Sequence, residues 1–237
     1  MKDFALDGRL LSVAELVRQG AEFADIGTDH AYLPLALLRE GRIFRAVCSD
    51  INDGPLESAR KNALEAGFYD NIRFYLTDGA AALSGEGITD MAICGMGGEL
   101  IADIIDRAPY LKSSDIHLIL QPMSKQAHLR AYLAREGYKI LCESYSYSQG
   151  KYYVTLLSCY TGAPYELTEV ECELGFLASR GAKTECERGF LLEKQRAFMR
   201  ALDGKRRGNL PHGIEISVLE AIAKALDGEN AIFNSEI

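Results

Sequence analysis

The chain has 237 residues, of which 48% are hydrophobic and 25% are charged, and its formal net charge is −8. This length accommodates one core domain with a small appendage, and this composition excludes a disordered or fibrous protein. No apolar run reaches the roughly 20 residues of a membrane span, and the first residues lack the basic and then apolar pattern of a signal peptide, so we expect a cytoplasmic protein.

Apolar residues recur at helical spacing from Leu6 to Val17 and predict an opening helix that ends before Gly20. Short apolar runs then alternate with amphipathic ones. The expected strands lie near residues 22–26, 45–50, 72–76, 91–94 and 116–120, and the expected helices near 31–40, 54–66, 97–107 and 124–136. Such alternation is typical of an α/β protein whose parallel sheet is covered by helices on both faces.

The pattern changes after the fifth strand, because residues 138–145 and 152–160 are both strand-like and no helix separates them. They predict an antiparallel pair. Five parallel strands followed by such a pair is the element order of the class I methyltransferase fold, a Rossmann-like, mostly parallel sheet of seven strands.

Beyond residue 163 the composition shifts to glutamate, lysine and arginine without strand signals. Two amphipathic segments flank a break at 204–213 and predict a helical hairpin. We therefore expect a sheet domain over residues 1–163 and a C-terminal helical hairpin over residues 164–237.

The turn after the first strand carries the most informative residues. The apolar run that ends at Ile26 leads into Gly27, Thr28, Asp29 and His30 before the next helix. A dinucleotide-binding turn has glycine at its second conserved position, where bare backbone approaches a pyrophosphate. Asp29 stands there, and a carboxylate repels a pyrophosphate but suits a cationic amino-acid group or a ribose. The turn therefore favours S-adenosylmethionine over NAD and argues against a nicotinamide-dependent dehydrogenase.

Three more strand ends add polar groups to the same edge of the sheet. Asp50 ends the second strand 25 residues after Asp25, the spacing of an acid that binds the ribose of an adenosine cofactor, although a helix-capping Asp is the alternative. Residues 78–79 follow the third strand and offer a carboxylate to an adenine amino group. Residues 94–98 end the fourth strand with three glycines, which allow a planar group to approach the backbone closely.

Four strings occur in the order A-D-I-G-T-D-H-A-Y-L-P, C-G-M-G-G, L-Q-P and G-K-Y-Y. Together they resemble the bacterial tRNA (adenine-22-N1)-methyltransferase family, known as TrmK. The resemblance covers the sheet domain from Leu10 to about Leu157 and, weakly, the C-terminal helices, which form a coiled-coil hairpin in that family. It implies S-adenosylmethionine-dependent methylation of N1 of adenine 22 in tRNA, which gives 1-methyladenosine.

Carried over by matching positions, the resemblance implies two sets of site residues. The cofactor-binding set is Asp25, Gly27, Thr28, Asp29, His30, Asp50, Ile51, Asp78, Gly79, Cys94, Gly95 and Met96. The substrate-binding set is Gly97, Gly98, Gln121, Pro122, Lys151 and Tyr152, with residues 94–96 also near the target adenine. The family pattern usually has Ser at Thr28, Glu at Asp50, Ala at Cys94 and Asn at Met123.

The chemistry needs no strong base, because adenine N1 has an in-plane lone pair that attacks the sulfonium methyl group directly. The enzyme mainly has to align nitrogen, carbon and sulfur. Positive charge appears on the adenine, and Asp29 is the candidate catalytic residue because a carboxylate stabilises that charge. Helix capping is the alternative role for Asp29. We expect His30 to be a contact and not a base.

Residues 180–207 contain nine basic and four acidic side chains on an otherwise acidic protein. A paired adenine must leave its stack before N1 is accessible, so the protein must hold a deformed RNA through phosphate contacts. Lys194, Arg196 and Arg200 are therefore expected to bind tRNA, although a solvated helix face is the simpler explanation of such a charge run. A methyltransferase of this fold for a small molecule or a protein, and a non-catalytic cofactor-binding module, remain alternatives.

The six cysteines show no metal-ligand spacing, so we expect free thiols, no disulfide and no metal site. We expect most of them to be small buried hydrophobes, with Cys94 near the site as the exception. For the assembly we expect a monomer or a weak dimer.

Overall fold

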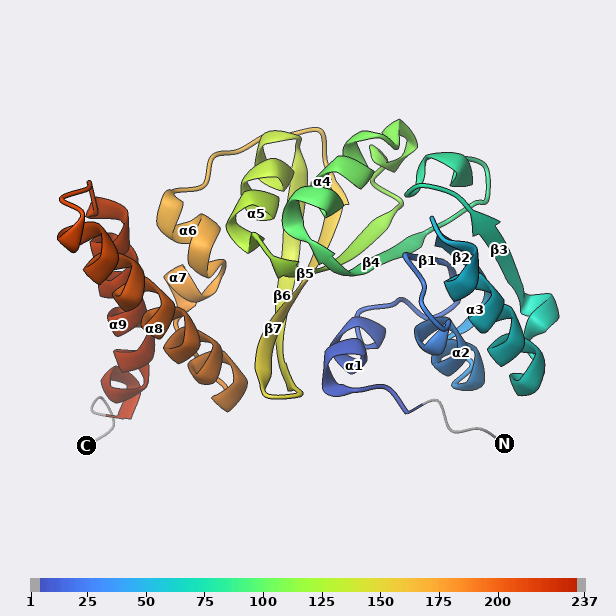
Figure 1. Cartoon of the computed structure of the whole chain (residues 1–237), viewed down its shortest axis with the longest axis horizontal. Coiled ribbons are helices and arrows are strands. Elements are labelled where there is room, and N and C mark those ends of the chain that lie inside the picture. Colours follow the sequence, from blue (N-terminus) through green and yellow to red (C-terminus); the bar gives the residue numbers. More distant parts are fainter. Residues whose placement is uncertain (1–4, 234–237) are drawn as a thin grey trace.

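The computed structural model describes the backbone of residues 5–233 and the side chains of residues 5–227. Its centre is a seven-stranded sheet with the order β3-β2-β1-β4-β5-β7-β6 (Figure 1). The strands are β1 (Ala21–Ile26), β2 (Ile43–Asp50), β3 (Ile72–Leu76), β4 (Asp90–Gly97), β5 (His117–Ser124), β6 (Tyr138–Ser148) and β7 (Lys151–Tyr160). The pairs among β1 to β5 are parallel, whereas β7 is antiparallel to both of its neighbours, β5 and β6. The predicted class I methyltransferase fold is confirmed.

Helices cover both faces of the sheet because its central strands are apolar on both sides. In β4, Met91 and Ile93 pack into one core with α4 and α5, whereas Ala92 packs into the other with α1, α2 and α3. The helices are α1 (Gly8–Ala14), α2 (Tyr32–Arg39), α3 (Asp53–Ala66), α4 (Gly98–Asp106) and α5 (Gln126–Arg135), and short 3-10 turns lie at Tyr69–Asn71, Ala81–Leu83 and Pro109–Leu111.

The antiparallel pair is longer than predicted. β6 continues to Ser148, where it pairs with Lys151 across a tight connection, so the pair forms a hairpin that projects beyond β5. Alternating serine and tyrosine over residues 144–148 suits a strand with one exposed face, but these polar residues made its end hard to recognise.

Four helices follow the sheet: α6 (Glu169–Leu174), α7 (Leu177–Arg180), α8 (Glu185–Arg207) and α9 (Gly213–Phe233). The long helices α8 and α9 form the expected hairpin at one end of the molecule (Figure 1). The short helices α6 and α7 were not predicted, although Thr168 begins α6 with a capping box. Helix α8 continues through Gly204 to Arg207, so the break is shorter than expected.

The C-terminal helices share a hydrophobic core with the β6–β7 hairpin. Val154 of β7 packs with Leu191 of α8 and Ile222 of α9, and Tyr145 of β6 lies 4.9 Å from Phe190 between ring centroids. The predicted boundary at residue 163 falls in the segment between β7 and α6, and the predicted end points at residues 1 and 237 lie outside the described part.

Two sequence expectations concern the whole chain. All six cysteines are free, but Cys48 alone is fully buried, so the burial expected for most of them is only partial. Within residues 5–233, no helix is both long enough and apolar enough to span a membrane.

Candidate active site

The carboxyl ends of β1 and β4 line a cavity of about 490 Å³. The fold brings seven predicted cofactor-binding residues to it: Asp25, Gly27, Thr28, Asp29, His30, Cys94 and Gly95. They come together because β1 and β4 are neighbouring parallel strands, so the turns after both strands meet at one edge of the sheet.

The turn after β1 is tied to β2 and to its own strand. The backbone N–H groups of Gly27 and Thr28 donate to the Ser49 carbonyl oxygen at 2.8 and 2.9 Å. The Thr28 hydroxyl donates to Asp25 at 2.6 Å, and both residues are buried. Burial raises the pKa of Asp25 to about 6, although the Thr28 hydrogen bond and the positive charge of Arg9 oppose that shift. The site therefore holds a buried acid that titrates near neutral pH.

Asp29 differs from Asp25 because its side chain is 78% exposed. Its carboxylate lies 3.4 Å from Nε2 of His30, whose ring stacks on Tyr32 with 5.2 Å between centroids. The N-cap position of α2 is Ala31, whose φ of 56° is left-handed and which offers no capping side chain. In this structure Asp29 lines the cavity and does not cap the helix.

A smaller cavity of about 170 Å³ lies beside the first, which we call the larger cavity of this pair. The smaller cavity is lined by the other predicted cofactor residues: Asp50, Ile51, Asp78, Gly79 and Met96. Oδ1 of Asp50 accepts the backbone N–H of Asn52 at 2.7 Å, which orients this carboxylate at the end of β2. Asp78 is instead engaged by Arg107, whose Nη1 lies 2.6 Å from Oδ2. This hydrogen bond lowers the pKa of Asp78.

The two cavities share Gly27. Gly27 has a φ of 75°, and a Cβ added to it would overlap the terminal methyl group of Met96. Glycine is required here for two reasons, the left-handed backbone and the close approach of Met96. The Met96 side chain therefore lies over Gly27, where the two cavities meet.

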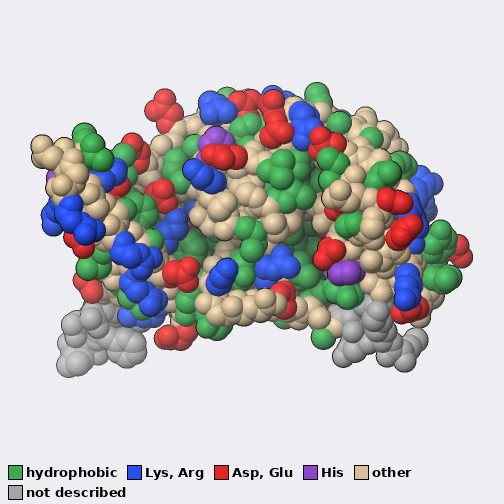
Figure 2. Space-filling view, in the orientation of Figure 1, with side chains coloured by type: hydrophobic (Ala, Val, Ile, Leu, Met, Phe, Trp, Pro, Cys, Tyr) green, Lys and Arg blue, Asp and Glu red, His purple; other side chains and the backbone are tan. Residues whose placement is uncertain are grey.

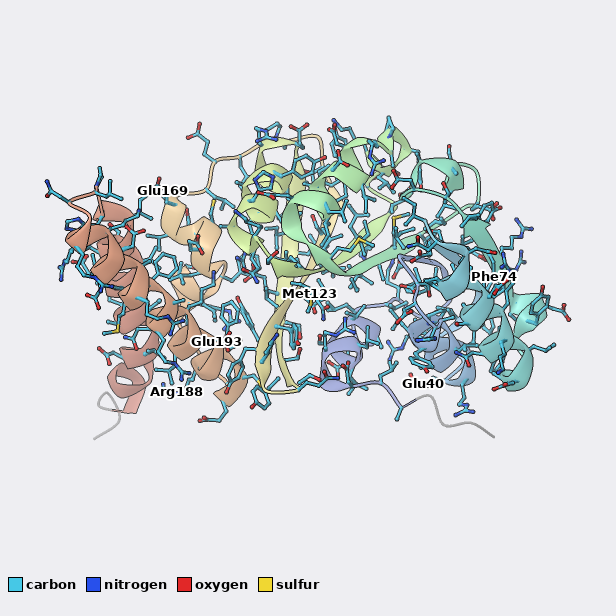
Figure 3. The ribbon with its side chains drawn as sticks, viewed as in Figure 1. Glu40, Phe74, Met123, Glu169, Arg188 and Glu193 are labelled. Carbon is cyan, nitrogen blue, oxygen red and sulfur yellow. The ribbon has the colours of Figure 1, made fainter. Side chains whose placement is uncertain are left out.

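Two more cavities, of about 310 and 560 Å³, lie between the β6–β7 hairpin and α8, and we call them together the hairpin groove. Both are lined by Lys151, Tyr152 and Glu193. The inner cavity reaches Pro122 and Met123 at the end of β5, and the outer one is lined by Tyr147, Arg196 and Arg200. Figure 3 labels Met123 and Glu193, which both line the inner cavity. The fold thus brings Lys151, Tyr152, Arg196 and Arg200 together in one cavity. This arrangement is compatible with the prediction that all four contact the same substrate.

The basic region of α8 is less uniform than the sequence suggested. Figure 2 shows basic side chains on the part of the surface that α8 forms. Arg196 and Arg200 are exposed, but the Lys194 side chain is only 15% exposed and its Nζ lies 2.7 Å from Glu173. Lys194 lines the inner cavity as a member of this ion pair. Lys194 is therefore engaged by Glu173, unlike the exposed Arg196 and Arg200, and its contact with tRNA stays a prediction.

Three predicted substrate residues do not line any of these cavities. Gln121 is fully buried, with both amide atoms hydrogen-bonded to Arg9. A Cβ on Gly98 would overlap the carbonyl oxygen of Lys125, so this glycine permits α4 to begin against the loop before α5. Gly97 faces the Ser124 hydroxyl. These surroundings give each of the three residues a structural role, and the approach of an adenine to them stays a prediction.

Sequence reasoning missed Arg9, which lines the larger cavity from α1. No local spacing connects residue 9 with the turn after β1, and no motif marked it. The aromatic residues Tyr147 and Phe190 of the hairpin groove were also missed, because they lie on separate elements that meet only in the folded chain. Among the described residues, no group of three or more His, Cys, Asp or Glu side chains is arranged to hold a metal ion.

Comparison with known proteins identifies relatives over most of the chain. A family model described as a methyltransferase domain matches residues 6–156. The tRNA (adenine(22)-N(1))-methyltransferase of Bacillus subtilis is 34% identical over 158 residues, which cover 67% of this chain and 66% of that protein. The alignment thus spans slightly less than two thirds of that relative.

Two solved structures match almost the whole chain. A Streptococcus pneumoniae protein, described as a candidate tRNA (m1A22) methyltransferase and solved with S-adenosyl-L-methionine, is 30% identical with a TM-score of 0.80, and the match covers 94% of this chain and 100% of that one. TrmK of M. capricolum, solved with S-adenosyl-homocysteine, is 27% identical with a TM-score of 0.78, and the match covers 94% and 98%.

Proposed function

Because this chain belongs to the tRNA (adenine-22-N1)-methyltransferase family, we propose that it transfers a methyl group from S-adenosylmethionine to N1 of adenine 22 in tRNA. One observation supports this function above the others. The acidic turn of β1 and the acid of β2 line two adjoining cavities, and a groove with basic and aromatic side chains lies between the β6–β7 hairpin and α8. The product is 1-methyladenosine.

The residues of the two cavities fit the cofactor. Asp25 and Asp29 offer carboxylates to the ammonium group of its methionyl part, and Asp50 offers its free oxygen to the ribose hydroxyls. A ligand that occupies both cavities has to cross Gly27, so Met96 must turn away, which its long unbranched side chain permits. The cofactor, when bound, supplies an electrophilic sulfonium methyl group.

Asp29 is our candidate for stabilising the methylated base. Its carboxylate is exposed to the larger cavity and lies near His30, whereas Asp25 is buried and hydrogen-bonded to Thr28. A positioned carboxylate favours the cation that forms on the adenine as the methyl group moves. No residue has to remove a proton, because N1 attacks through its own lone pair.

The hairpin groove is our candidate for holding the RNA beside the reacting base. Lys151, Arg196 and Arg200 offer cations to phosphates, although the protein as a whole is acidic. Tyr147 and Tyr152, whose ring centroids are 4.7 Å apart, offer faces on which an unpaired base can stack. We propose that α8, in the helical part after residue 163, binds tRNA together with the β6–β7 hairpin in this way, within a cytoplasmic enzyme that is a monomer or a weak dimer.

The test is methyl transfer from labelled S-adenosylmethionine to two unmodified bacterial tRNA transcripts, one with adenine and one with guanine at position 22, with the product position mapped by mass. We expect 1-methyladenosine at position 22 in the first transcript and none in the second. Equal transfer to both transcripts would overturn the position, and transfer only to small molecules or proteins would overturn the substrate class. Cofactor binding with no transfer to any acceptor would favour the non-catalytic binding module.

A further inference from the structure

The larger cavity contains one basic side chain that the family comparison and the sequence did not assign. Arg9 is the only Lys or Arg among the described residues that line this cavity, whereas Asp7, Asp25 and Asp29 line it as acids. The guanidinium influences the cavity, because its positive charge lowers the pKa values of Asp25 and Cys94 against the effect of burial. A single cation among three acids matches a ligand that carries positive charge and one carboxylate.

The position of Arg9 is built into the core. Its Nη1 donates to Oε1 of Gln121 at 3.0 Å, and Nε2 of Gln121 donates back to the Arg9 carbonyl oxygen at 3.3 Å. Gln121 is fully buried in β5, so this reciprocal pair joins α1 to the centre of the sheet. Nε of Arg9 also lies 3.7 Å from Asp7, and the Arg9 side chain is 23% exposed. A guanidinium held in this way loses little side-chain freedom when it binds a ligand.

We propose that Arg9 binds the carboxylate of the methionyl group of S-adenosylmethionine, and that Gln121 is its positioning residue. The methionyl group has an ammonium and a carboxylate on one carbon atom. The acids of the turn after β1 suit the ammonium, and Arg9 is the described cation in the same cavity that suits the carboxylate. Guanidinium groups present paired N–H donors that match a carboxylate. Gln121 thereby acts through Arg9 and not on the target adenine.

This inference rests on the proposed function only for the identity of the cofactor. Its test uses no RNA, so a failure of methyl transfer and a failure of carboxylate recognition are separate results. The full chain is titrated calorimetrically with S-adenosylmethionine and with decarboxylated S-adenosylmethionine, which lacks the carboxylate and keeps the sulfonium and the amine.

We expect Arg9→Gln to weaken the binding of S-adenosylmethionine by about 10- to 100-fold and that of the decarboxylated ligand by less than about threefold. The affinity of Arg9→Lys for S-adenosylmethionine should lie between those of the wild type and Arg9→Gln, because lysine keeps the charge and loses the paired donors. Lys61→Gln removes an exposed cation on α3 and is the matched control, for which both affinities should stay unchanged.

Gln121→Met keeps the side-chain volume and removes the hydrogen bonds to Arg9. We expect it to weaken the binding of S-adenosylmethionine more than that of the decarboxylated ligand. In the double variant with Arg9→Gln, it should weaken the binding of S-adenosylmethionine little further. Unfolding curves of each variant establish that the comparison is made on folded protein. If Gln121 had only a structural role, Gln121→Met would weaken the binding of both ligands alike.

Three outcomes would overturn the proposal. The first is an equal loss for both ligands in Arg9→Gln, which would assign Arg9 to the fold. The second is an unchanged affinity of Arg9→Gln for S-adenosylmethionine, which would show that Arg9 does not bind the cofactor. The third is a wild-type protein that binds both ligands equally, which would show that no group in this cavity reads the carboxylate.

Discussion

The Tyr152 ring lies directly against the backbone of Gly189, where the β6–β7 hairpin meets α8, so that a Cβ on Gly189 would overlap the ring. This packing sets the width of the hairpin groove, because Tyr152 lines both of its cavities. Glycine in the middle of a helix is unfavourable relative to alanine by about 1 kcal/mol, so its presence here has a packing reason.

Gly189→Ala is expected to displace Tyr152 and to weaken tRNA binding by about tenfold, a change of about 1.4 kcal/mol in binding free energy, while S-adenosylmethionine binding stays unchanged. Gly204 on the same helix has open space around it, so Gly204→Ala is the matched control and should raise the free energy of unfolding by about 0.5–1 kcal/mol. Filter binding and urea unfolding measure the two effects. Equal tRNA affinity in both variants would show that the packing of Tyr152 on Gly189 does not shape the RNA site.

Asp25 predicts a pH-dependent stability. Burial raises its pKa to about 6 in the folded protein, above the value of an unfolded Asp, so the folded state favours the protonated form. The free energy of unfolding therefore includes the full benefit of the protonated carboxyl below the pKa of the unfolded state. It loses that benefit as the pH rises through the folded-state pKa of about 6. Asp25→Asn keeps an acceptor for Thr28, and at pH 8 it should raise the free energy of unfolding of the cofactor-free protein by up to about 3 kcal/mol.

Urea unfolding at pH 4 and pH 8 measures this effect, with the exposed Asp29→Asn as control. A benefit of Asp25→Asn that is equal at both pH values would contradict the raised pKa.

The raised pKa of Asp25 also predicts that cofactor affinity depends on pH, because a cationic ligand favours the ionised carboxylate. The affinity of wild type for S-adenosylmethionine should fall about tenfold from pH 7 to pH 5, and Asp25→Asn should remove that dependence.

Asp29 predicts a change in turnover. If its carboxylate stabilises the charge that forms on the adenine, Asp29→Asn lowers kcat by about 10- to 100-fold and changes the Kd of S-adenosylmethionine much less. His30→Gln removes the neighbouring ring and should lower kcat by less than about tenfold, because N1 needs no general base. Single-turnover methylation measures both. A loss in Asp29→Asn that lies entirely in cofactor affinity would leave Asp29 with its role in binding the methionyl ammonium group and none in stabilising the methylated base.

Arg196 and Arg200 predict a salt-dependent tRNA affinity. Charge reversal of both residues to Glu should weaken tRNA binding by more than about tenfold and reduce the slope of log K against log salt by about 2, one unit for each phosphate that is no longer neutralised. Arg206 and Arg207 are exposed at the end of the same helix, and their reversal changes the charge equally outside the groove. If both pairs weaken binding alike, the RNA senses the overall charge of α8 and not the groove.

Arg130 predicts the largest loss of stability. Its Nε lies 2.6 Å from Glu143, both side chains are almost completely buried, and its Nη1 donates to the Cys172 carbonyl oxygen at the end of α6. Arg130→Met leaves Glu143 without its cation and should lower the free energy of unfolding by about 3–5 kcal/mol. Arg135→Met removes an exposed arginine of the same helix and should change it by less than about 0.5 kcal/mol. Similar losses in the two variants would show that the buried pair has no special weight.

The elements of the sheet domain were predictable because their signals are local. A buried strand such as β1 needs only a few consecutive apolar residues, and the turn that follows it concentrates Gly27, Thr28 and Asp29 in adjacent positions. The alternation of strands and helices implies a parallel sheet, in which the carboxyl ends of β1 and β2 lie at the same edge. Asp25 and Asp50 could therefore be expected near one another. The resemblance to a known family rested on the same short strings.

Side-chain partners from distant elements had no such signal. Gln121 was placed near the adenine by the resemblance to the family, but packing of α1 against the sheet brings Arg9 to its amide, 112 residues away in the chain. Lys194 was grouped with Arg196 and Arg200 as a tRNA-binding residue because all three lie in a basic stretch of sequence, whereas docking of α8 places it beside Glu173. Periodicity specifies which elements form and in what order, and only the close packing of these elements determines which polar groups are buried together and which remain available to a ligand.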